Sequence, residues 1–230
     1  MPTEALWCVV PAAGSGTRFG GGVPKQYMPL RGRPLLMVTL ERLATCEVIG
    51  GFVVVLARSD AHWPGATRIG GKPVRIATGA DQRSGSVLAG LRALPEAVAS
   101  DAYVLVHDAA RPCVEPHDIE RLVDLGIPAG GALLAAPLRD TLKRADGAAR
   151  VLETEPRESR WRALTPQLFR RGELESALAE AERTGIAITD ESMAMERAGH
   201  HPLLVEGAES NLKVTTPADL LLAEYLLRFS

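Results

Sequence analysis

Short apolar runs alternate with amphipathic segments along most of the 230-residue chain. The runs are rich in Val, Leu and Ile, and they occupy residues 6–13, 51–57, 74–78, 102–107 and 131–137. Their apolar character is continuous, which is typical of parallel strands covered on both faces by other elements. The pattern therefore predicts that these ranges form a buried, mostly parallel sheet.

Helices are expected between these strands. Two segments repeat apolar residues with the spacing of one helix face; these residues are Leu36, Leu40 and Leu43 in the first segment, and Val87, Leu91 and Leu94 in the second. Pro116 and Pro217 stand where helices would begin, and Thr216 with Asp219 fits the cap of the second one. Further helices are expected at 171–184 and 190–198, and strands at 202–207 and 211–214. This alternation predicts a Rossmann-like α/β fold with right-handed crossovers.

Residues 140–168 break the alternation because they show no helical period. Asp146-Gly147 between two polar-alternating stretches predicts a hairpin turn. The segment is too polar for the interior of the main sheet, and a long exposed hairpin usually needs a partner to cover its edges. We therefore expect one domain over residues 1–230, with a protruding β-hairpin arm at about 138–168 whose edges a partner would cover.

Bulk composition narrows the class of protein. A net charge of −2 argues against a nucleic-acid-binding surface, which is normally strongly basic. Cys8, Cys46 and Cys113 lie in or beside apolar runs and far apart, which favours buried thiols over disulfides or a zinc site. Neither a leader pattern nor an apolar run long enough to span a membrane is visible, so a cytoplasmic location without membrane contact is expected.

A glycine loop follows the first expected strand. Gly14 and Gly16 allow backbone N–H groups to converge on an anion. A dinucleotide fingerprint needs a third glycine where this chain has Phe19, and the loop continues through residues 20–22 instead of entering a helix. The spacing therefore argues against an NAD-dependent dehydrogenase.

Arg18 and Lys25 are the cations of this loop. Most Arg and Lys side chains are simply solvated. These two, however, follow a strand at the edge where open α/β sheets bind ligands, and Pro24 fixes the backbone before Lys25. A phosphate-rich ligand would explain both charges.

The motifs now resemble a known family. The pattern AAGxGxR at 12–18 with PKQ at 24–26 is similar to the nucleotidyltransferases that activate sugar and alditol phosphates. With HDAARP (107–112), RDTLKR (139–144), ALTPQLF (163–169), TDES (189–192) and NLKVTTPADL (211–220), the chain resembles the 2-C-methyl-D-erythritol 4-phosphate cytidylyltransferase family from Val9 to about Glu224. The resemblance implies a nucleotide-diphospho-sugar transferase type of fold. It also implies cytidylyl transfer from CTP to 2-C-methyl-D-erythritol 4-phosphate in the non-mevalonate isoprenoid pathway, with release of pyrophosphate.

The resemblance also implies site residues. The catalytic cations are Arg18, Lys25 and Lys213. The nucleotide-binding residues are Ala12, Ala13, Gly14, Gly16, Gly79, Asp81, Ser84, Ser86 and Asp108, although Ala80 stands where relatives often carry a glycine. Asp108 is also the expected ligand of Mg²⁺ or another divalent cation. Thr141, Arg157 and Thr165 are expected to bind the alditol phosphate, partly across a dimer interface.

This chemistry needs no general base. The attacking phosphate monoester has a second pKa of about 6 and is already anionic at neutral pH. Positioning and cations should therefore carry catalysis. We expect His107 to be structural, Asp190 and Glu191 to cap a helix with a possible secondary role at the site, and Arg111 to serve either the fold or the site.

Two alternatives stay open on the sequence. A cytidylyltransferase for another alditol phosphate, such as ribitol 5-phosphate, would share the loop and the arm. A non-catalytic nucleotide-binding regulatory module would keep the fold, but such a module would be expected to lose one of the charges, all of which are present.

Overall fold

The computed structural model describes residues 5–14 and 23–229 and has an 8-stranded sheet at its centre. The strand order across the sheet is β12-β8-β11-β7-β1-β4-β6-β5. Its strands are β1 (Leu6–Pro11), β4 (Ile49–Leu56), β5 (Arg68–Ile69), β6 (Lys72–Thr78), β7 (Tyr103–Val106), β8 (Ala132–Pro137), β11 (Trp161–Arg170) and β12 (Leu203–Glu206). The strands expected from the continuous apolar runs are confirmed.

Most strand pairs in this sheet are parallel. The strand β1 runs parallel to both β4 and β7, β4 is parallel to β6, and β8 is parallel to β12. The exception in the middle of the sheet is β11, which is antiparallel to β7 and to β8. Since the chain proceeds from β1 toward β6 and then returns to the other side of β1, the sheet changes direction between β1 and β7. Open α/β sheets bind ligands at such a point, outside the carboxyl ends of the strands.

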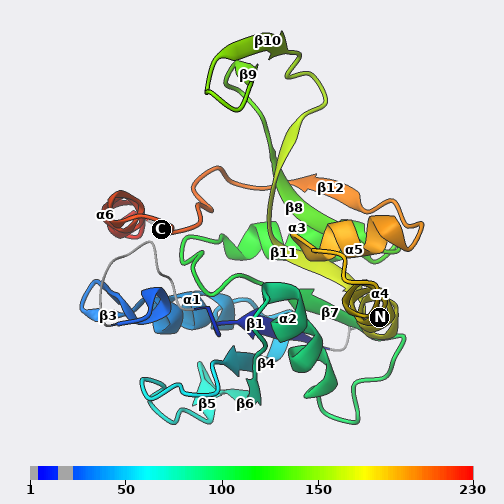
Figure 1. Cartoon of the computed structure of the whole chain (residues 1–230). Helices are drawn as coiled ribbons and strands as arrows, with labels where there is room; N and C mark the ends of the chain where they lie inside the picture. Colours follow the sequence, from blue (N-terminus) through cyan, green and yellow to red (C-terminus); the bar gives the residue numbers. More distant parts are fainter. Residues whose placement is uncertain (1–4, 15–22, 230) are drawn as a thin grey trace.

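Helices cover both faces of the sheet (Figure 1). They are α1 (Leu35–Ala44), α2 (Arg83–Arg92), α3 (Pro116–Gly126), α4 (Arg171–Arg183), α5 (Glu191–Arg197) and α6 (Pro217–Leu226). The short elements η2 (Lys25–Tyr27), β2 (Pro29–Leu30) and β3 (Arg33–Pro34) connect β1 to α1. The predicted cap of α6 is confirmed, because Thr216 accepts from the N–H of Asp219 and Asp219 accepts from the N–H of Thr216.

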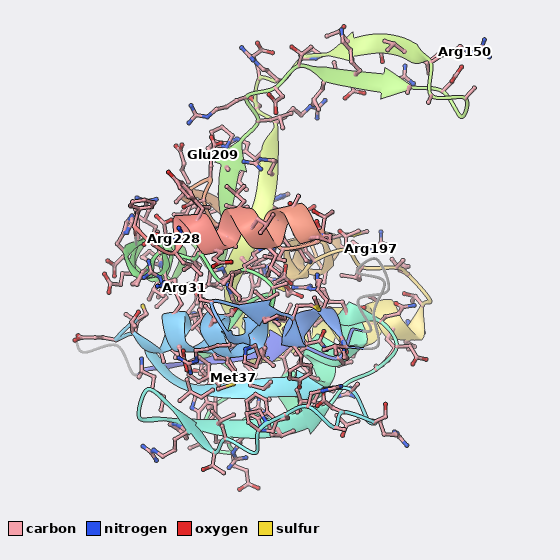
Figure 2. The ribbon with its side chains drawn as sticks, turned by 90° about the vertical axis from the view of Figure 1, so that its left-hand side faces the viewer. Arg31, Met37, Arg150, Arg197, Glu209 and Arg228 are labelled. Carbon is pink, nitrogen blue, oxygen red and sulfur yellow. The ribbon has the colours of Figure 1, made fainter. Side chains whose placement is uncertain are left out.

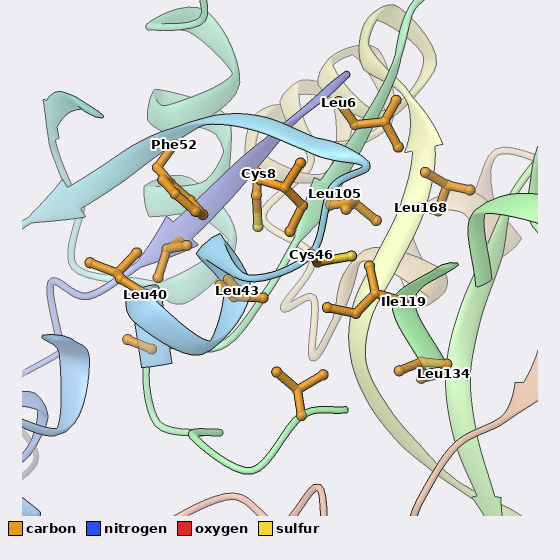
Figure 3. Packing of buried hydrophobic residues seen from close by; sticks show 14 of the residues in the cluster. Leu6, Cys8, Leu40, Leu43, Cys46, Phe52, Leu105, Ile119, Leu134 and Leu168 are labelled. Atoms are coloured by element: carbon orange, nitrogen blue, oxygen red, sulfur yellow. The ribbon is translucent and has the colours of Figure 1, made fainter. Parts of the chain in front are cut away.

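Alternate residues of the strands build two separate cores. Cys8 and Val10 of β1 face the cluster formed with α1 and α3, which Figure 3 shows from close by. Val9, between them, faces the opposite cluster, to which α2, α4 and α5 contribute Leu88, Leu178 and Met195. Because both faces are covered, these strands carry apolar residues at successive positions and not at every second one.

The arm is a hairpin of β9 (Leu142–Ala145) and β10 (Val151–Glu155) that stands away from the body of the molecule (Figure 1). Arg150 lies near its tip (Figure 2). The predicted turn is confirmed, because the N–H of Asp146 donates to Arg150 O at 2.9 Å. Val151 and Leu152 on β10 are 62% and 55% exposed. The arm therefore presents apolar surface away from the body.

Two expectations about strands are wrong. Residues 161–168 were assigned to the arm as too polar for the main sheet, yet β11 lies between β7 and β8 with Leu164, Thr165 and Gln167 buried. Pairing of β11 with β8 also shifts register between Ala163 and Gln167. Residues 211–214 form no strand; this described stretch makes one backbone bond to the body, from Val214 N to Ala110 O at 2.8 Å, and Val214 packs beside α6.

No helix in the described ranges is both long and apolar enough to cross a lipid bilayer.

Candidate active site

A cavity of about 290 Å³ opens at the carboxyl ends of β1 and β7, where the sheet changes direction. Its lining residues are Pro11, Ala12, Ala13, Gly14, Lys25, Gln26, Ala80, Asp81, Gln82, Arg83, Ser86, Asp108, Ala109, Ala110 and Lys213. Small residues follow the ends of β1 and β7, whereas the charged residues come from several segments: Lys25 after β1, Asp81 and Arg83 after β6, Asp108 after β7, and Lys213 after β12. The cavity therefore combines small apolar residues with the cations Lys25, Arg83 and Lys213.

Asp108 follows β7 and is surrounded by cations. Its Oδ2 lies 3.0 Å from Lys213 Nζ and 3.3 Å from Arg111 Nε, and its Oδ1 lies 2.9 Å from Arg83 Nε. Burial alone would raise the pKa of Asp108, but the charges of Arg83, Lys213 and Arg111 outweigh burial and hold this pKa well below its usual range. Asp108 is therefore an anion at any ordinary pH.

Arg83 links this carboxylate to a second one. Its Nη1 and Nη2 atoms donate to the two carboxylate oxygens of Glu191 at 2.6 and 3.1 Å. The Glu191 side chain is fully buried at the start of α5, while Arg83 opens α2. Desolvation would lower the pKa of Arg83, but Glu191 and Asp108 together raise it above its ordinary value. The site thus contains a charge network that joins two helix starts to a strand end.

His107 is fully buried between Thr165 and Arg111. Its Nδ1 lies 3.0 Å from Thr165 Oγ1, and its Nε2 lies 3.1 Å from Arg111 O. Burial lowers the pKa of His107 to about 4, so that the ring is neutral near neutral pH. Thr165 Oγ1 also accepts from the N–H of Asp108 at 3.1 Å. The hydroxyl of Thr165 is therefore held by two consecutive residues, His107 and Asp108, that follow the end of β7.

The loop after β6 approaches β1 closely. A Cβ on Gly79 would come within 2.4 Å of Ala13 Cβ and 2.8 Å of Ser86 Oγ, so only glycine fits there. Ser86 Oγ donates to Ala80 O at 3.1 Å and receives the N–H of Ala80 at the same distance. These contacts hold the loop against the mouth of the cavity.

A second cavity, of about 230 Å³, shares Arg83, Asp108 and Lys213 with the first. Thr165 and Arg111 line it from the other side. Arg111 is fixed there by a donated bond from Nη1 to Asn211 O at 2.7 Å. Two adjoining spaces thus meet at Asp108 and Lys213, which suits a reaction between two ligands.

The amino-acid sequence matches the family model described as 2-C-methyl-D-erythritol 4-phosphate cytidylyltransferase over residues 6–229. The chain belongs to this family. Curated members from Xanthomonas euvesicatoria pv. vesicatoria (strain 85-10) and Stenotrophomonas maltophilia (strain K279a) are each 55% identical over 226 residues. The alignments cover 98% of this chain and 86% and 97% of those proteins, respectively.

Solved structures of the cytidylyltransferase family share the fold. The Francisella tularensis 2-C-methyl-D-erythritol 4-phosphate cytidylyltransferase is 30% identical, with a TM-score of 0.82 over 97% of this chain and 100% of that one. A crystal structure of 4-diphosphocytidyl-2C-methyl-D-erythritol synthase is 33% identical, with a TM-score of 0.81 over 97% of this chain and 99% of that one. The predicted α/β nucleotidyltransferase fold is confirmed.

Most of the site residues predicted from the sequence motifs lie together at the two cavities. The first cavity brings together Ala12, Ala13, Gly14, Lys25, Asp81, Ser86, Asp108 and Lys213, with Gly79 packed behind them, and Thr165 lines the second. Ser84 lies on α2 outside the lining of the first cavity. Gly16 and Arg18 lie outside the described residues. Thr141 and Arg157 belong to the exposed arm segment and line neither of these cavities.

The sequence motifs do not include Arg83, and they give Glu191 a capping role with a possible secondary role at the site. Asp190 is the cap, since its carboxylate accepts from the N–H of Met193 at 3.0 Å. A signal for Arg83 was present, because it stands at the same strand-to-helix junction as Asp81, on the ligand-binding edge of the sheet. Nothing in the sequence ties Arg83 to Glu191.

The first cavity of this cytidylyltransferase holds carboxylates that could bind a divalent cation. Within residues 5–14 and 23–229, no three His, Cys, Asp or Glu side chains gather into a metal-binding group. Asp108 and Asp81 are the carboxylates that line the first cavity. Mg²⁺ is usually bound through one or two carboxylates together with substrate phosphates, so a shared site suits these residues better than a resident ion.

Proposed function

We propose that the chain transfers the cytidylyl group of CTP to 2-C-methyl-D-erythritol 4-phosphate, giving 4-diphosphocytidyl-2-C-methyl-D-erythritol and pyrophosphate. The proposal rests on one observation: Lys213, Arg83 and Arg111 converge on Asp108 where two cavities meet, in a chain of the cytidylyltransferase family. Two polyanions need such a set of cations in order to approach each other. A cytoplasmic location is part of the proposal and is supported by Cys8, Cys46 and Cys113, which are buried free thiols.

The reaction is an in-line displacement at phosphorus. A phosphate oxygen of the acceptor attacks the α-phosphorus of CTP, a new P–O bond forms, and the bond to the β-phosphate oxygen breaks as pyrophosphate leaves. The acceptor needs no general base, since a phosphate monoester has a second pKa of about 6. Mg²⁺ shared between Asp108 and the triphosphate would offset the negative charge of the phosphates.

Cations supply the rest of the catalysis. Lys213 lies at the junction of the two cavities, next to Asp108, and is the best candidate to contact the α-phosphate. Lys25 lines the first cavity and suits the β- and γ-phosphates and the departing pyrophosphate. Arg18 shares this role in the proposal. Fixed charges of this kind stabilise the charge that builds up in the transition state.

The nucleoside is assigned to the first cavity. Ala12, Ala13, Ala109 and Ala110 offer small side chains on which a flat base can lie close to the backbone. The loop with Gly79 and Asp81, together with Ser86 of α2, closes one side and carries backbone and side-chain groups for the cytosine edge. Ser84, in the first turn of α2, is assigned to the same side of the nucleoside in this proposal. The acceptor is assigned to the second cavity, beside Thr165 and Arg111.

We further propose that the arm makes the chain a homodimer and brings Thr141 and Arg157 to the acceptor of the partner subunit. The exposed Val151 and Leu152 support this assignment, because an isolated hairpin with apolar residues on its surface is poorly stable alone. In analytical ultracentrifugation, the double variant Val151→Asp/Leu152→Asp should sediment as a monomer, whereas the wild-type protein should sediment as a dimer. Leu221→Asp on α6, at a residue that is 71% exposed, is the matched control and should leave the dimer intact.

Pyrophosphate release tests the main proposal. The protein is incubated with Mg²⁺, one of the four common NTPs, and either 2-C-methyl-D-erythritol 4-phosphate or ribitol 5-phosphate. We expect release with CTP and the methylerythritol phosphate. Release only with ribitol 5-phosphate would change the acceptor, and no release with CTP and any alditol phosphate would overturn the enzyme assignment.

A further inference from the structure

The hydrogen bond between His107 and Thr165 has a definite direction, and the proposed mechanism gives it no role. His107 has two polar contacts, with Thr165 Oγ1 at 3.0 Å and with Arg111 O at 3.1 Å. Thr165 Oγ1 has a second contact, with the N–H of Asp108 at 3.1 Å. Both side chains are buried, with 0% of His107 and 4% of Thr165 exposed.

The direction of each bond follows from what each group can do. A backbone carbonyl only accepts, so Nε2 of His107 carries the proton that it donates to Arg111 O. In the neutral ring, Nδ1 is then an acceptor, and its partner, the hydroxyl of Thr165, must donate to it. The single proton of Thr165 is thereby used within the protein.

The remaining capacity of Thr165 is that of an acceptor. A hydroxyl oxygen has two lone pairs, and the N–H of Asp108 takes one of them. Thr165 lines the second cavity beside Asp108 and Lys213, so the other lone pair is the group that it can offer to a ligand. A ligand hydroxyl can donate to this lone pair, whereas a phosphate oxygen cannot.

We propose that His107 is a positioning residue that fixes Thr165 as a pure acceptor, so that Thr165 binds a hydroxyl of a polyol phosphate and keeps phosphate oxygens away from that position. The phosphate of the same ligand is then directed to Arg111 and Lys213, which line the same cavity. The inference rests on the proposed function and specifies how part of its acceptor site selects a ligand. It also gives His107 a role that extends beyond holding the fold.

The bond direction can be measured without turnover. In protein labelled with ¹⁵N-histidine, the two ring nitrogens of His107 are distinguished by NMR, with the His107→Gln variant assigning the signals. We expect a protonated Nε2 and an unprotonated Nδ1 near neutral pH, and a change at Nδ1 in Thr165→Val. A protonated Nδ1 would overturn the proposal.

A double-mutant cycle tests whether His107 acts through Thr165. Since each variant costs one hydrogen bond to the acceptor, His107→Leu and Thr165→Val should each raise the KM for 2-C-methyl-D-erythritol 4-phosphate about tenfold or more, with less than about a threefold change in the KM for CTP. The double variant should be no worse than Thr165→Val alone, within about twofold. Effects that multiply would mean that His107 acts independently of Thr165, and would overturn the proposal.

Two further variants provide controls. His107→Gln keeps an acceptor and a donor on one side chain and should retain part of the affinity for the acceptor. This variant replaces His107→Leu in the test if His107→Leu does not fold. Thr189 lines the same cavity but donates to Met193 Sδ instead of contacting His107, so Thr189→Val and His107→Leu should act independently. If wild-type protein releases no pyrophosphate with any acceptor, the proposed function fails, and the NMR measurement still decides the direction of the bond.

Discussion

The Nε atom of Arg83 lies 2.9 Å from Oδ1 of Asp108. This contact joins the first residue of α2 to the residue that follows the end of β7, and the same guanidinium also holds the buried carboxylate of Glu191. One side chain thus pairs with two anions that come from distant parts of the sequence. The position of Asp108 in the site therefore depends on an arginine that the family motifs quoted from the sequence do not include.

Loss of Arg83 should destabilise the protein. In Arg83→Met the buried Glu191 has no cation, and an uncompensated buried charge costs about 3–5 kcal/mol in the free energy of unfolding. Urea unfolding measures the loss. Arg92→Met, on the same helix, is the control, because Arg92 pairs with Glu175 at the surface and should lower the free energy of unfolding by less than about 1 kcal/mol.

A double variant separates stability from catalysis. Arg83→Met with Glu191→Leu replaces both charges by apolar groups, which is often neutral for stability. We expect the free energy of unfolding to recover most of the loss. Turnover should stay at least about tenfold below wild type, because Asp108 keeps Lys213 and Arg111 but still lacks Arg83. Normal turnover in the double variant would mean that Arg83 serves the fold alone.

Gly79→Ala should weaken binding of CTP. Its Cβ would meet Ala13 Cβ at 2.4 Å, which forces the loop after β6 away from the end of β1. Overpacking of this kind lowers the free energy of unfolding by about 1–3 kcal/mol. The matched variant is Gly14→Ala, where a Cβ would have no atom within 4 Å. In Gly79→Ala, calorimetric titration should show weaker binding of CTP, and thermal unfolding should show lower stability. In Gly14→Ala, thermal unfolding should show unchanged stability.

Lys25→Ala should lower turnover by well over tenfold, since loss of one transition-state charge contact costs about 3 kcal/mol. The control is Lys72→Ala on β6, whose Nζ donates to Cys46 O away from the two cavities. Steady-state kinetics with saturating CTP compares the two variants. Near-normal turnover of Lys25→Ala would remove Lys25 from the catalytic group.

Asp219 should make stability pH-dependent in the acid range. Hydrogen bonds from Thr215, followed by the N–H of Thr216, lower the pKa of Asp219 to about 2. Because the unfolded value is about 3.9, the stabilisation is complete above that pH and is lost as the pH falls toward 2. After allowance for solvent exposure we expect a loss of about 1 kcal/mol.

Asp219→Asn tests this assignment. The variant should be less stable than wild type at pH 7, and the difference should shrink between about pH 4 and 2. Asp124→Asn on the exposed side of α3 is the control. A difference from wild type that does not change with pH would show that the charge of Asp219 does not stabilise the cap.

The sequence was most informative where the signal is local. Continuous apolar runs located β1, β4, β6, β7 and β8, and the cap at Thr216 was readable because its partner Asp219 lies in the next turn. The family motifs then indicated residues at both cavities. These signals need no knowledge of which distant segments meet.

The errors come from long-range pairing. The polarity of residues 161–168 argues against a place inside the main sheet. Within the sheet, however, Thr165 is bonded to His107, and Gln167 receives the N–H of Ser192 at 2.7 Å and donates to Asp190 at 2.9 Å. Such bonds allow polar residues inside a sheet, and a pattern of polarity cannot reveal them. The same limit applies to Arg83 and Glu191.

The register shift in β11 divides its pairing with β8 into two ladders. On one side of the shift, Trp161–Ala163 pairs with Pro137–Ala135 at the base of the arm. On the other side, Gln167 and Leu168 pair with Leu133 and Ala132 in the middle of the sheet. Thr165 lies between these ladders, where a bulge can turn a side chain out of the pleat. Pairing at the base of the arm is therefore set separately from the pairing in the middle of the sheet, and Thr165, the hydroxyl that we propose for the acceptor, lies at the boundary between the two.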